Sequence, residues 1–312
     1  MRSVLTLRIL ILDSLRHLRL DCLTHTISPI CPLFYPHEAC MTPAEIRDLA
    51  HSAAHDVQPV LPHNLAPRRI TPTEAVHASL ASVESFARLI DHTLLKPDAT
   101  EAQIRALCAE ARQHGFATVC VNGAWAGLCR DLLADSGVGL TCVIGFPLGA
   151  MATAAKVFEA QQAIRDGATE IDMVLSVGAL KGGDLRGVAS DIAAVALACH
   201  TGGALLKVIL ETGFLTDEEK VEACGLCLAA QADYVKTSTG FGPGGATPAD
   251  VALMRAAVGD QAGVKAAGGI RTLADARAMV EAGATRLGAS AGVRLVQEYL
   301  GAAQSSGASS GY

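Results

Sequence analysis

From Thr73 to Leu300, short apolar runs alternate with longer segments in which apolar residues recur at helical spacing. The short runs are rich in Val, Ile and Leu, which is typical of buried parallel strands. Residues that favour helix N-caps, such as Thr100 and Thr216, precede several of the longer segments. Strands are therefore expected over residues 90–94, 118–121, 139–144, 170–174, 204–210, 234–237, 263–266 and 286–288.

Each expected strand is followed by an expected helix, so the pattern is eight β–α units in series. Such alternation requires parallel strands joined by right-handed crossovers. Eight units predict an α/β protein with a closed (β/α)8, or TIM, barrel. An open doubly wound sheet is the alternative, but it usually carries a G-x-G-x-x-G turn after its first strand. The first turn here reads Leu94-Leu95-Lys96-Pro97, which favours the barrel.

The segments outside this pattern differ from it in composition. The first forty residues combine a Leu- and Arg-rich start with a proline cluster, and Met41 opens a sequence of different character. We expect a disordered or non-native leader there, with an Arg-bearing targeting segment as the other interpretation. The expected organisation is a leader (1–40), an N-terminal helix and Pro-rich linker (41–78), a (β/α)8 barrel (79–300) and a flexible tail of Gly, Ser and Ala (301–312).

Composition and charge narrow the possible partners. The formal net charge of −6 gives no electrostatic basis for binding nucleic acid. The apolar run from Leu5 to Leu12 contains Arg8 and is too short to span a bilayer, so no membrane partner is expected. Ten cysteines are scattered through apolar segments, which favours reduced, buried thiols and a cytoplasmic location.

Charged residues inside the expected strands are the main anomaly of the sequence. A barrel interior is normally filled by branched apolar side chains, so each buried charge must be paired or used. A satisfied internal ion pair is the simplest explanation for any one of them. Near the carboxyl ends of several strands, however, they would converge on one pocket. They are Asp91 or its neighbour His92, Asp172, Lys207, Lys236 and Lys265.

That pocket suggests a definite chemistry. Lys236 alternates with the apolar Val235 and is expected to point into the barrel, where burial and a second ammonium lower the pKa of an amine. The free amine can attack a carbonyl and form an imine, which acts as an electron sink for carbon–carbon cleavage. A carboxylate such as Asp172 can carry protons. The histidines show no metal-ligand spacing, so neither a metal nor another cofactor is expected.

Glycine-rich turns follow the last three expected strands. Gly240 and its neighbours follow the strand of Lys236, Gly268 and Gly269 follow that of Lys265, and Gly288 leads to Ser290. Each could be an ordinary tight turn. Their recurrence on adjacent strands favours a phosphate site, because backbone N–H groups in such turns bind anions and barrels often bind phosphate there.

These motifs resemble those of the deoxyribose-phosphate aldolase family. The resemblance rests on residues 236–240 (Lys-Thr-Ser-Thr-Gly), 265–272 (Lys-Ala-Ala-Gly-Gly-Ile-Arg-Thr), 90–97, 119–122, 143–149, 170–174 and 207–212, and spans about residues 85–295. It implies a class I aldolase that cleaves 2-deoxy-D-ribose 5-phosphate to acetaldehyde and D-glyceraldehyde 3-phosphate, in deoxyribonucleoside catabolism. It also implies a homo-oligomer, with a dimer expected.

By motif match, Lys236 would form the Schiff base, Lys265 would tune the pKa of Lys236, and Asp172 would transfer protons. Asp91 joins the catalytic set. Substrate and phosphate binding are assigned to Thr239, Gly240, Gly268, Gly269, Gly288, Ser290 and Lys207.

The C-terminal tyrosine, Tyr312, is a further candidate. Some members of the family end in such a tyrosine, and the resemblance implies that its phenol folds over the barrel mouth and joins proton transfer. A solvated terminus without a role is the alternative. At the level of the whole protein, the alternatives are a lysine-dependent aldolase acting on a keto substrate and a non-catalytic phosphosugar-binding barrel.

Overall fold

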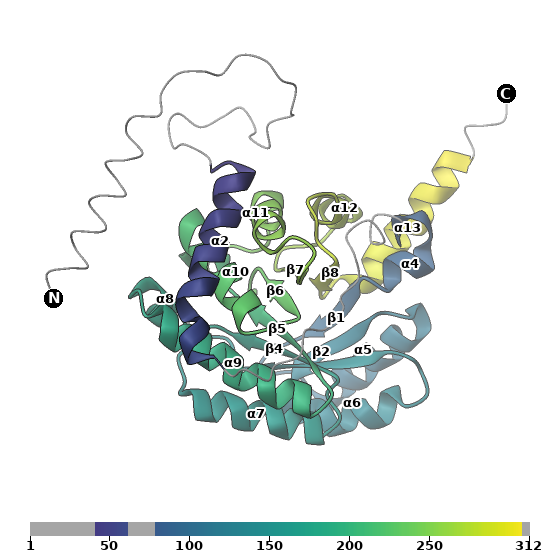
Figure 1. Ribbon diagram of the computed structural model, residues 1–312. Coiled ribbons are helices and arrows are strands. Elements are labelled where there is room, and N and C mark those ends of the chain that lie inside the picture. The colour runs from purple at the N-terminus through teal and green to yellow at the C-terminus, as the bar shows by residue number, and fades with distance from the viewer. Residues whose placement is uncertain (1–40, 62–78, 308–312) are drawn as a thin grey trace, which may run out of the picture. The chain divides into compact units, whose positions relative to one another are not determined.

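The computed structural model describes residues 41–61 and 79–307, with side chains to residue 302 (Figure 1). Contacts divide the chain into Met1–Cys40 and Met41–Tyr312, and every described residue belongs to the second unit. The expectations for the leader, for most of the Pro-rich linker and for Tyr312 therefore lie outside the described residues.

Eight parallel strands form a closed barrel in chain order, with β1 also pairing to β8 (Figure 1). The predicted (β/α)8 fold is thereby confirmed. The strands are β1 (Ile90–Leu94), β2 (Thr118–Asn122), β3 (Gly139–Ile144), β4 (Glu170–Val174), β5 (Leu205–Ile209), β6 (Tyr234–Lys236), β7 (Gly263–Ala267) and β8 (Arg286–Ala289).

Helices surround the barrel and bury their apolar faces against the outer faces of the strands (Figure 1). Strand residues such as Val119, Val208 and Val235 point into this layer and are fully buried. The helices are α2 (Pro43–Val57), α4 (Val83–Ala87), α5 (Glu101–His114), α6 (Ala126–Leu133), α7 (Thr153–Arg165), α8 (Val177–Lys181), α9 (Leu185–Thr201), α10 (Asp217–Ala229), α11 (Pro248–Val258), α12 (Leu273–Glu281) and α13 (Gly292–Gly307). None of the described helices is long and apolar enough to cross a membrane.

The N-terminal helix α2 is longer than the sequence pattern indicates. The pattern predicts a helix over residues 42–50, whereas α2 continues to Val57 and a 3-10 turn follows at Gln58–Val60. Ala50, Ala53 and Val57 extend its buried stripe. A Cβ on Gly225 of α10 would lie 2.2 Å from the Ala50 carbonyl oxygen, so the two helices pack backbone to backbone. This close packing holds the middle of α2 against α10, a contact that a local pattern cannot reveal.

The larger differences from the sequence pattern lie at three other places. A single helix over 79–89 is predicted, but Ser82 caps a new helix there, so the segment is a 3-10 turn (Ser79–Ala81) followed by α4. Helix α8 was not expected. The last helix, α13, runs to Gly307 instead of ending at Leu300, because no proline interrupts the segment that was expected to be a flexible tail from Gly301.

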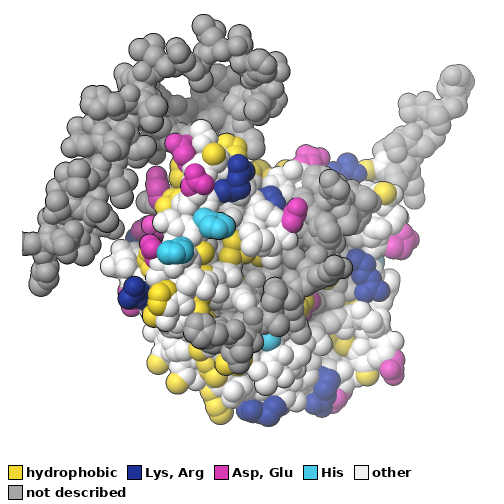
Figure 2. All heavy atoms as spheres, in the orientation of Figure 1, with side chains coloured by type: hydrophobic (Ala, Val, Ile, Leu, Met, Phe, Trp, Pro, Cys, Tyr) yellow, Lys and Arg dark blue, Asp and Glu magenta, His cyan; other side chains and the backbone are white. Residues whose placement is uncertain are grey.

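On the face shown in Figure 2, Lys and Arg side chains are interspersed with Asp and Glu side chains, and two histidine side chains lie side by side. The described side chains on that face form no continuous basic area of the kind that binds nucleic acid.

Candidate active site

The charged strand residues converge inside the barrel because of the strand register. Lys236 of β6 is level with Lys265 of β7, and Asp172 of β4 is level with Lys207 of β5. All four side chains point to the inner face and are almost fully buried. The predicted convergence of separate strand residues on one site is therefore seen directly.

Asp172 lies at the centre of this group. Its Oδ2 atom is 2.7 Å from the Nζ of Lys236 and 2.7 Å from the Nζ of Lys265. Its Oδ1 atom is 2.7 Å from the Nζ of Lys207. One carboxylate thus serves three lysines, and its Oδ2 atom is shared between the two lysines of β6 and β7.

Asp91 of β1 forms the second acceptor of the cluster. It receives a hydrogen bond from Lys265, and its Oδ1 atom is 2.7 Å from Nη1 of Arg286. The sequence left Asp91 and His92 as alternatives. His92 points outward instead, where its Nε2 lies 2.6 Å from Glu110 of α5 and its ring packs on Phe116. The alternation of the strand therefore selects Asp91 for the barrel interior.

Glu170 and Arg286, which the sequence analysis did not single out, belong to the same cluster. Glu170 lies 2.6 Å from the Nζ of Lys207 and 3.1 Å from Nη1 of Arg286. Both are charged residues at the start of strands, and Glu170 is two positions before Asp172 and so shares its face. That signal was present in the sequence. The Lys207 ammonium, which was assigned to substrate binding, pairs with Asp172 and Glu170 and is fully buried in the cluster.

Burial and neighbouring charges act in opposite directions on the carboxylates. Burial alone would raise the pKa of Asp172, but the ammonium groups of Lys207, Lys236 and Lys265 outweigh it and hold that pKa well below its usual range. The pKa of Asp91 is likewise lowered, because Lys265 and Arg286 outweigh the effect of burial. Both groups are carboxylates at neutral pH.

The two lysines that share Asp172 differ in their protonation. Burial is the largest influence on Lys236 and lowers its pKa, and the Lys265 ammonium lowers it further, against the opposing effect of Asp172. Burial also acts to lower the pKa of Lys265, but Asp172 and Asp91 outweigh it and raise that pKa. Lys236 is therefore the amine that loses its proton first, and Lys265 stays charged.

The glycine-rich turns pack against one another at the ends of β6 and β7. The amide of Ala246 donates to the Gly268 carbonyl (2.9 Å), and a Cβ on Gly245 would be 2.5 Å from that oxygen. Gly240 and Gly268 have φ values of 84° and 91°, which glycine tolerates best. Thr239 is buried beside Gly240. The glycine turns after β6 and β7, which the sequence predicts to bind phosphate, are thus adjacent in space.

The remaining phosphate candidates are Gly269, Gly288 and Ser290. Gly269 follows Gly268 with a φ of 82°. A Cβ on Gly288 would be 3.1 Å from the Cε of Lys265, so this glycine leaves room for that side chain. Ser290 follows β8 and is exposed.

Glu211 is a further residue that the sequence analysis missed. Its carboxylate accepts hydrogen bonds from the Thr239 amide (3.2 Å) and from the Thr239 hydroxyl, although it comes from the loop after β5. The backbone of Glu211 is left-handed, with φ of 57°, which is unfavourable for a non-glycine residue. The packing of the two loops holds this conformation and fixes Thr239.

The other polar features of the described residues point to no second centre. Among them, no three His, Cys, Asp or Glu side chains are arranged to hold a metal ion. Cys224 and Cys227 form a C-x-x-C in α10, but both are buried and burial raises the pKa of Cys224 to about 12. A buried thiol with a raised pKa is a poor nucleophile and metal ligand.

A (β/α)8 barrel that holds a buried lysine of lowered pKa beside a charged lysine and a carboxylate has the site of a lysine-dependent, class I aldolase. Residues 85–311 match the model of the DeoC/LacD family of aldolases. The chain belongs to this family.

Individual relatives agree with this membership. The chain is 59% identical over 213 residues to a deoxyribose-phosphate aldolase of Lysinibacillus sphaericus, covering 68% of this chain and 95% of the relative. It is 56% identical to the deoxyribose-phosphate aldolase of Thermoanaerobacter sp., covering 69% and 97%. A solved structure of a putative deoxyribose-phosphate aldolase from Coccidioides immitis is 43% identical with a TM-score of 0.69, covering 83% of this chain and 98% of that one.

Proposed function

We propose that this protein reversibly cleaves 2-deoxy-D-ribose 5-phosphate to D-glyceraldehyde 3-phosphate and acetaldehyde through an imine on Lys236. The observation that carries the proposal is the shared carboxylate oxygen of Asp172, which pairs Lys236 with a second lysine whose charge is retained. Lys236 is thereby the lysine of the cluster with a lowered pKa. The names of the curated relatives supply the substrate.

Chemistry begins with the neutral amine of Lys236. It attacks the C1 aldehyde of the open-chain sugar, and loss of water from the carbinolamine leaves a protonated imine. A base removes the proton of the C3 hydroxyl, the C2–C3 bond breaks, and its electron pair moves onto the imine to give an enamine. Glyceraldehyde 3-phosphate leaves, the enamine carbon takes a proton, and water releases acetaldehyde from Lys236.

Asp172 is the group placed to move these protons. Its Oδ2 atom contacts the Nζ of Lys236, so it reaches the nitrogen at which the carbinolamine gains and loses protons. Lys265 donates a hydrogen bond to the same oxygen, so its ammonium can return a proton to the Asp172 carboxylate. Asp91, through its bond to Lys265, holds that ammonium in position.

The substrate phosphate would bind the turns after the last strands. Backbone amides around Gly240, Gly268 and Gly269 are grouped by the packing of the two loops, and such groups of N–H donors bind anions. Ser290 would add a hydroxyl donor, whereas the Thr239 hydroxyl already donates to Glu211. The buried hydroxyl of Ser238 has no hydrogen-bond partner among the described residues, which leaves one more donor in this region.

Reductive trapping tests the proposal directly. Acetaldehyde and borohydride should add a two-carbon unit to the peptide that contains Lys236, detected by peptide mass analysis. An adduct on Lys265 or Lys207 in place of Lys236 would contradict the assignment. Cleavage of 2-deoxy-D-ribose 5-phosphate, compared with keto-donor reactions of pyruvate or dihydroxyacetone phosphate, tests the substrate.

Replacing Lys265 by leucine is expected to move the pH–rate profile to higher pH. Without the Lys265 ammonium, Asp172 Oδ2 is left to Lys236 alone, and the pKa of Lys236 rises. Each unit of increase removes about nine-tenths of the neutral amine near pH 7. The pH dependence of kcat/KM reports this shift, and a profile that keeps its midpoint would remove Lys265 from the tuning of Lys236.

Replacing Glu211 by glutamine is expected to weaken binding of the phosphorylated sugar. The charge that holds the Thr239 amide and hydroxyl is lost, so the turn at Gly240 loosens. KM for 2-deoxy-D-ribose 5-phosphate should rise about tenfold, the value of one charge-assisted hydrogen bond. KM for unphosphorylated 2-deoxyribose is the internal control, and an equal rise for both sugars would argue against a role confined to the phosphate.

A further inference from the structure

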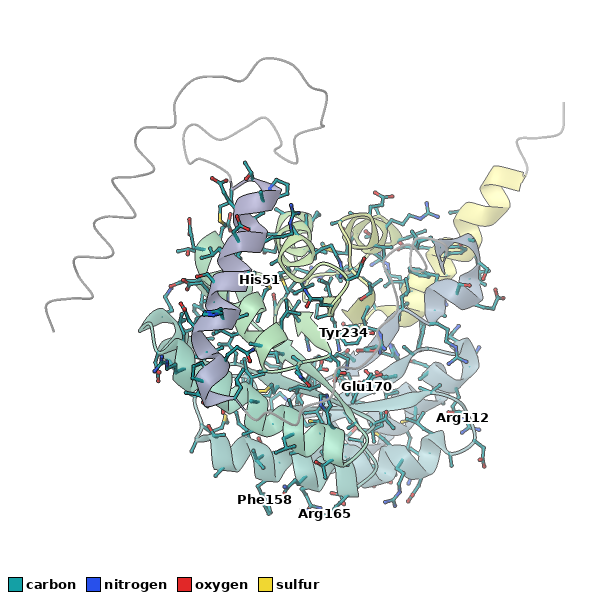
Figure 3. All side chains as sticks on the ribbon, viewed as in Figure 1. His51, Arg112, Phe158, Arg165, Glu170 and Tyr234 are labelled. Atoms are coloured by element: carbon teal, nitrogen blue, oxygen red, sulfur yellow. The ribbon has the colours of Figure 1, made fainter. Side chains whose placement is uncertain are left out.

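Arg286 and Glu170 form the end of the charge cluster that lies farthest from the barrel mouth. They are the first residues of β8 and β4, whereas the glycine turns follow the last residues of the strands. Nη1 and Nη2 of Arg286 each lie 3.3 Å from Glu170 Oε1. Tyr234, the first residue of β6, covers the guanidinium with its ring centroid 5.5 Å away. In Figure 3, Glu170 and Tyr234 lie within the ring of strands, whereas Phe158 and Arg165 belong to the outer helix α7.

An unbroken chain of contacts joins this pair to Lys236. Arg286 holds Asp91 through Oδ1, and Lys265 holds the other oxygen of Asp91. Lys265 also shares Asp172 Oδ2 with Lys236. On the other side, Glu170 holds Lys207, which holds Asp172 Oδ1. The strength of the pairing between Asp172 and Lys236 therefore depends on which cations are paired with Asp91 and Glu170.

Counting the charges of this cluster gives an imbalance. Four cationic side chains, Lys207, Lys236, Lys265 and Arg286, face three carboxylates, Asp91, Glu170 and Asp172. Uncompensated charge is costly in a dry interior, so the cluster is relieved when one cation loses its proton. Lys236 has a single carboxylate contact in the structure, whereas each of the other three cations has at least two.

The other groups that face the cluster do not change this count. Cys120 of β2 stays a neutral thiol, because burial raises its pKa. Thr141 of β3 contributes a hydroxyl that contacts Lys207 at 3.2 Å, and Tyr234 of β6 contributes its ring. Glu211, in the loop after β5, directs its carboxylate to the amide and hydroxyl of Thr239.

We propose that the Arg286–Glu170 pair are positioning residues that set how many protons the buried cluster holds, and thereby keep Lys236 in its reactive, neutral form. This inference rests on the proposed imine chemistry of Lys236. Arg286 supplies the surplus positive charge and occupies Asp91, so that Lys265 keeps its contact with Asp172. Glu170 limits the surplus to one by pairing with Lys207 and Arg286.

Single substitutions of the two partners should have opposite effects. In Arg286→Met, Asp91 and Glu170 become available to Lys265 and Lys207, so Asp172 pairs more fully with Lys236, which keeps its proton. In Glu170→Gln, Lys207 relies more on Asp172, so Lys236 loses its proton more easily. The midpoint of the pH dependence of Lys236 trapping by acetaldehyde and cyanoborohydride should rise by roughly one pH unit in the first variant and fall by roughly one in the second.

The double variant Arg286→Met/Glu170→Gln removes one charge of each sign and restores a surplus of one. Its midpoint should return to within a few tenths of a unit of the parent value, since the two shifts oppose each other. Lys156→Met is the matched control. Lys156 is fully buried and lies 2.5 Å from Asp191, but that pair joins α7 to α9 outside the barrel, so its loss should leave the midpoint unchanged.

The outcomes separate this inference from the proposed function. Thermal unfolding identifies any variant that is not folded at the assay temperature. If a single variant is unfolded, the midpoint of the double variant, in which neither member of the pair is charged, tests the inference instead. Shifts of the same sign in both single variants, or a double variant whose midpoint stays displaced, would overturn the role of the pair. Absence of an adduct on Lys236 in the parent protein would instead overturn the proposed function.

Discussion

Replacing Lys236 by arginine is expected to abolish cleavage of 2-deoxy-D-ribose 5-phosphate, with a loss of at least about 10⁴-fold in kcat. The reaction requires an amine that can lose its proton and form a covalent imine. A guanidinium stays protonated in proteins and cannot do so. The guanidinium can still donate to Asp172, so this contact is kept, but the buried cluster gains a positive charge that cannot be released.

Unfolding measurements separate the loss of covalent chemistry from any loss of folding. The unfolding temperature should fall, because the buried cluster holds an extra fixed charge, and in the folded variant acetaldehyde with borohydride should leave no adduct on the peptide around residue 236. Lys220→Arg on α10 is the control, because Lys220 pairs with Asp217 and Asp250 outside the barrel and should tolerate the change. Activity within tenfold of the parent in Lys236→Arg would exclude an obligatory imine at this position.

Replacing Asp172 by asparagine is expected to reduce both turnover and stability. Three lysines lose their shared counter-ion, and breaking a buried ion pair from one side costs about 3–5 kcal/mol of unfolding free energy. The proton carrier at the Lys236 nitrogen is lost as well, which should lower kcat by about 10²–10⁴-fold. Chemical denaturation and steady-state kinetics measure the two effects separately.

The stability deficit should also depend on pH. The pKa of Asp172 is lowered in the folded protein, so its carboxylate stabilises the fold above its unfolded pKa of about 3.9, and this contribution is lost as the pH falls through the lower folded pKa. The difference between parent and variant should be full at pH 7 and shrink in strong acid.

Asp191→Asn provides the comparison for Asp172→Asn. Asp191 is the buried partner of Lys156, so this change should cost stability without reducing kcat. A fall in kcat of the same size in both variants would mean that the catalytic loss follows from reduced stability and not from proton transfer.

The register of the barrel decided which charged residues act together. Lys236, Lys265 and Asp172 could be selected from the sequence because each interrupts an apolar strand, where a charge needs a specific partner. Their pairing could not, because Asp172 and Lys265 are 93 positions apart and meet only when the sheet closes. Glu170 and Arg286 carried the same local signal as the residues that were selected, but they lie at strand starts, where charged residues are ordinary.

The local pattern was also insufficient where packing between distant segments decides. Helix α2 continues to Val57 with Ala53 and Val57 buried, and the contact between Ala50 and Gly225 of α10 involves a residue far along the chain. Glu211 holds Thr239 from a neighbouring loop, and nothing in the spacing of Glu211 and Thr239 indicates that they meet. Both features are long-range contacts, which the periodicity of a single segment does not predict.

The sequence by itself determined the eight β–α units and the lysine expected to do the chemistry, because strand and helix periods, helix caps and a charge within an apolar strand are local properties. Only the tertiary structure decided that Asp91 and not His92 faces the interior, that Glu170 and Arg286 belong to the charge cluster, and that Lys236 has a single carboxylate contact. The protonation of a buried lysine depends on the full set of charges around it, and barrel closure brings that set together.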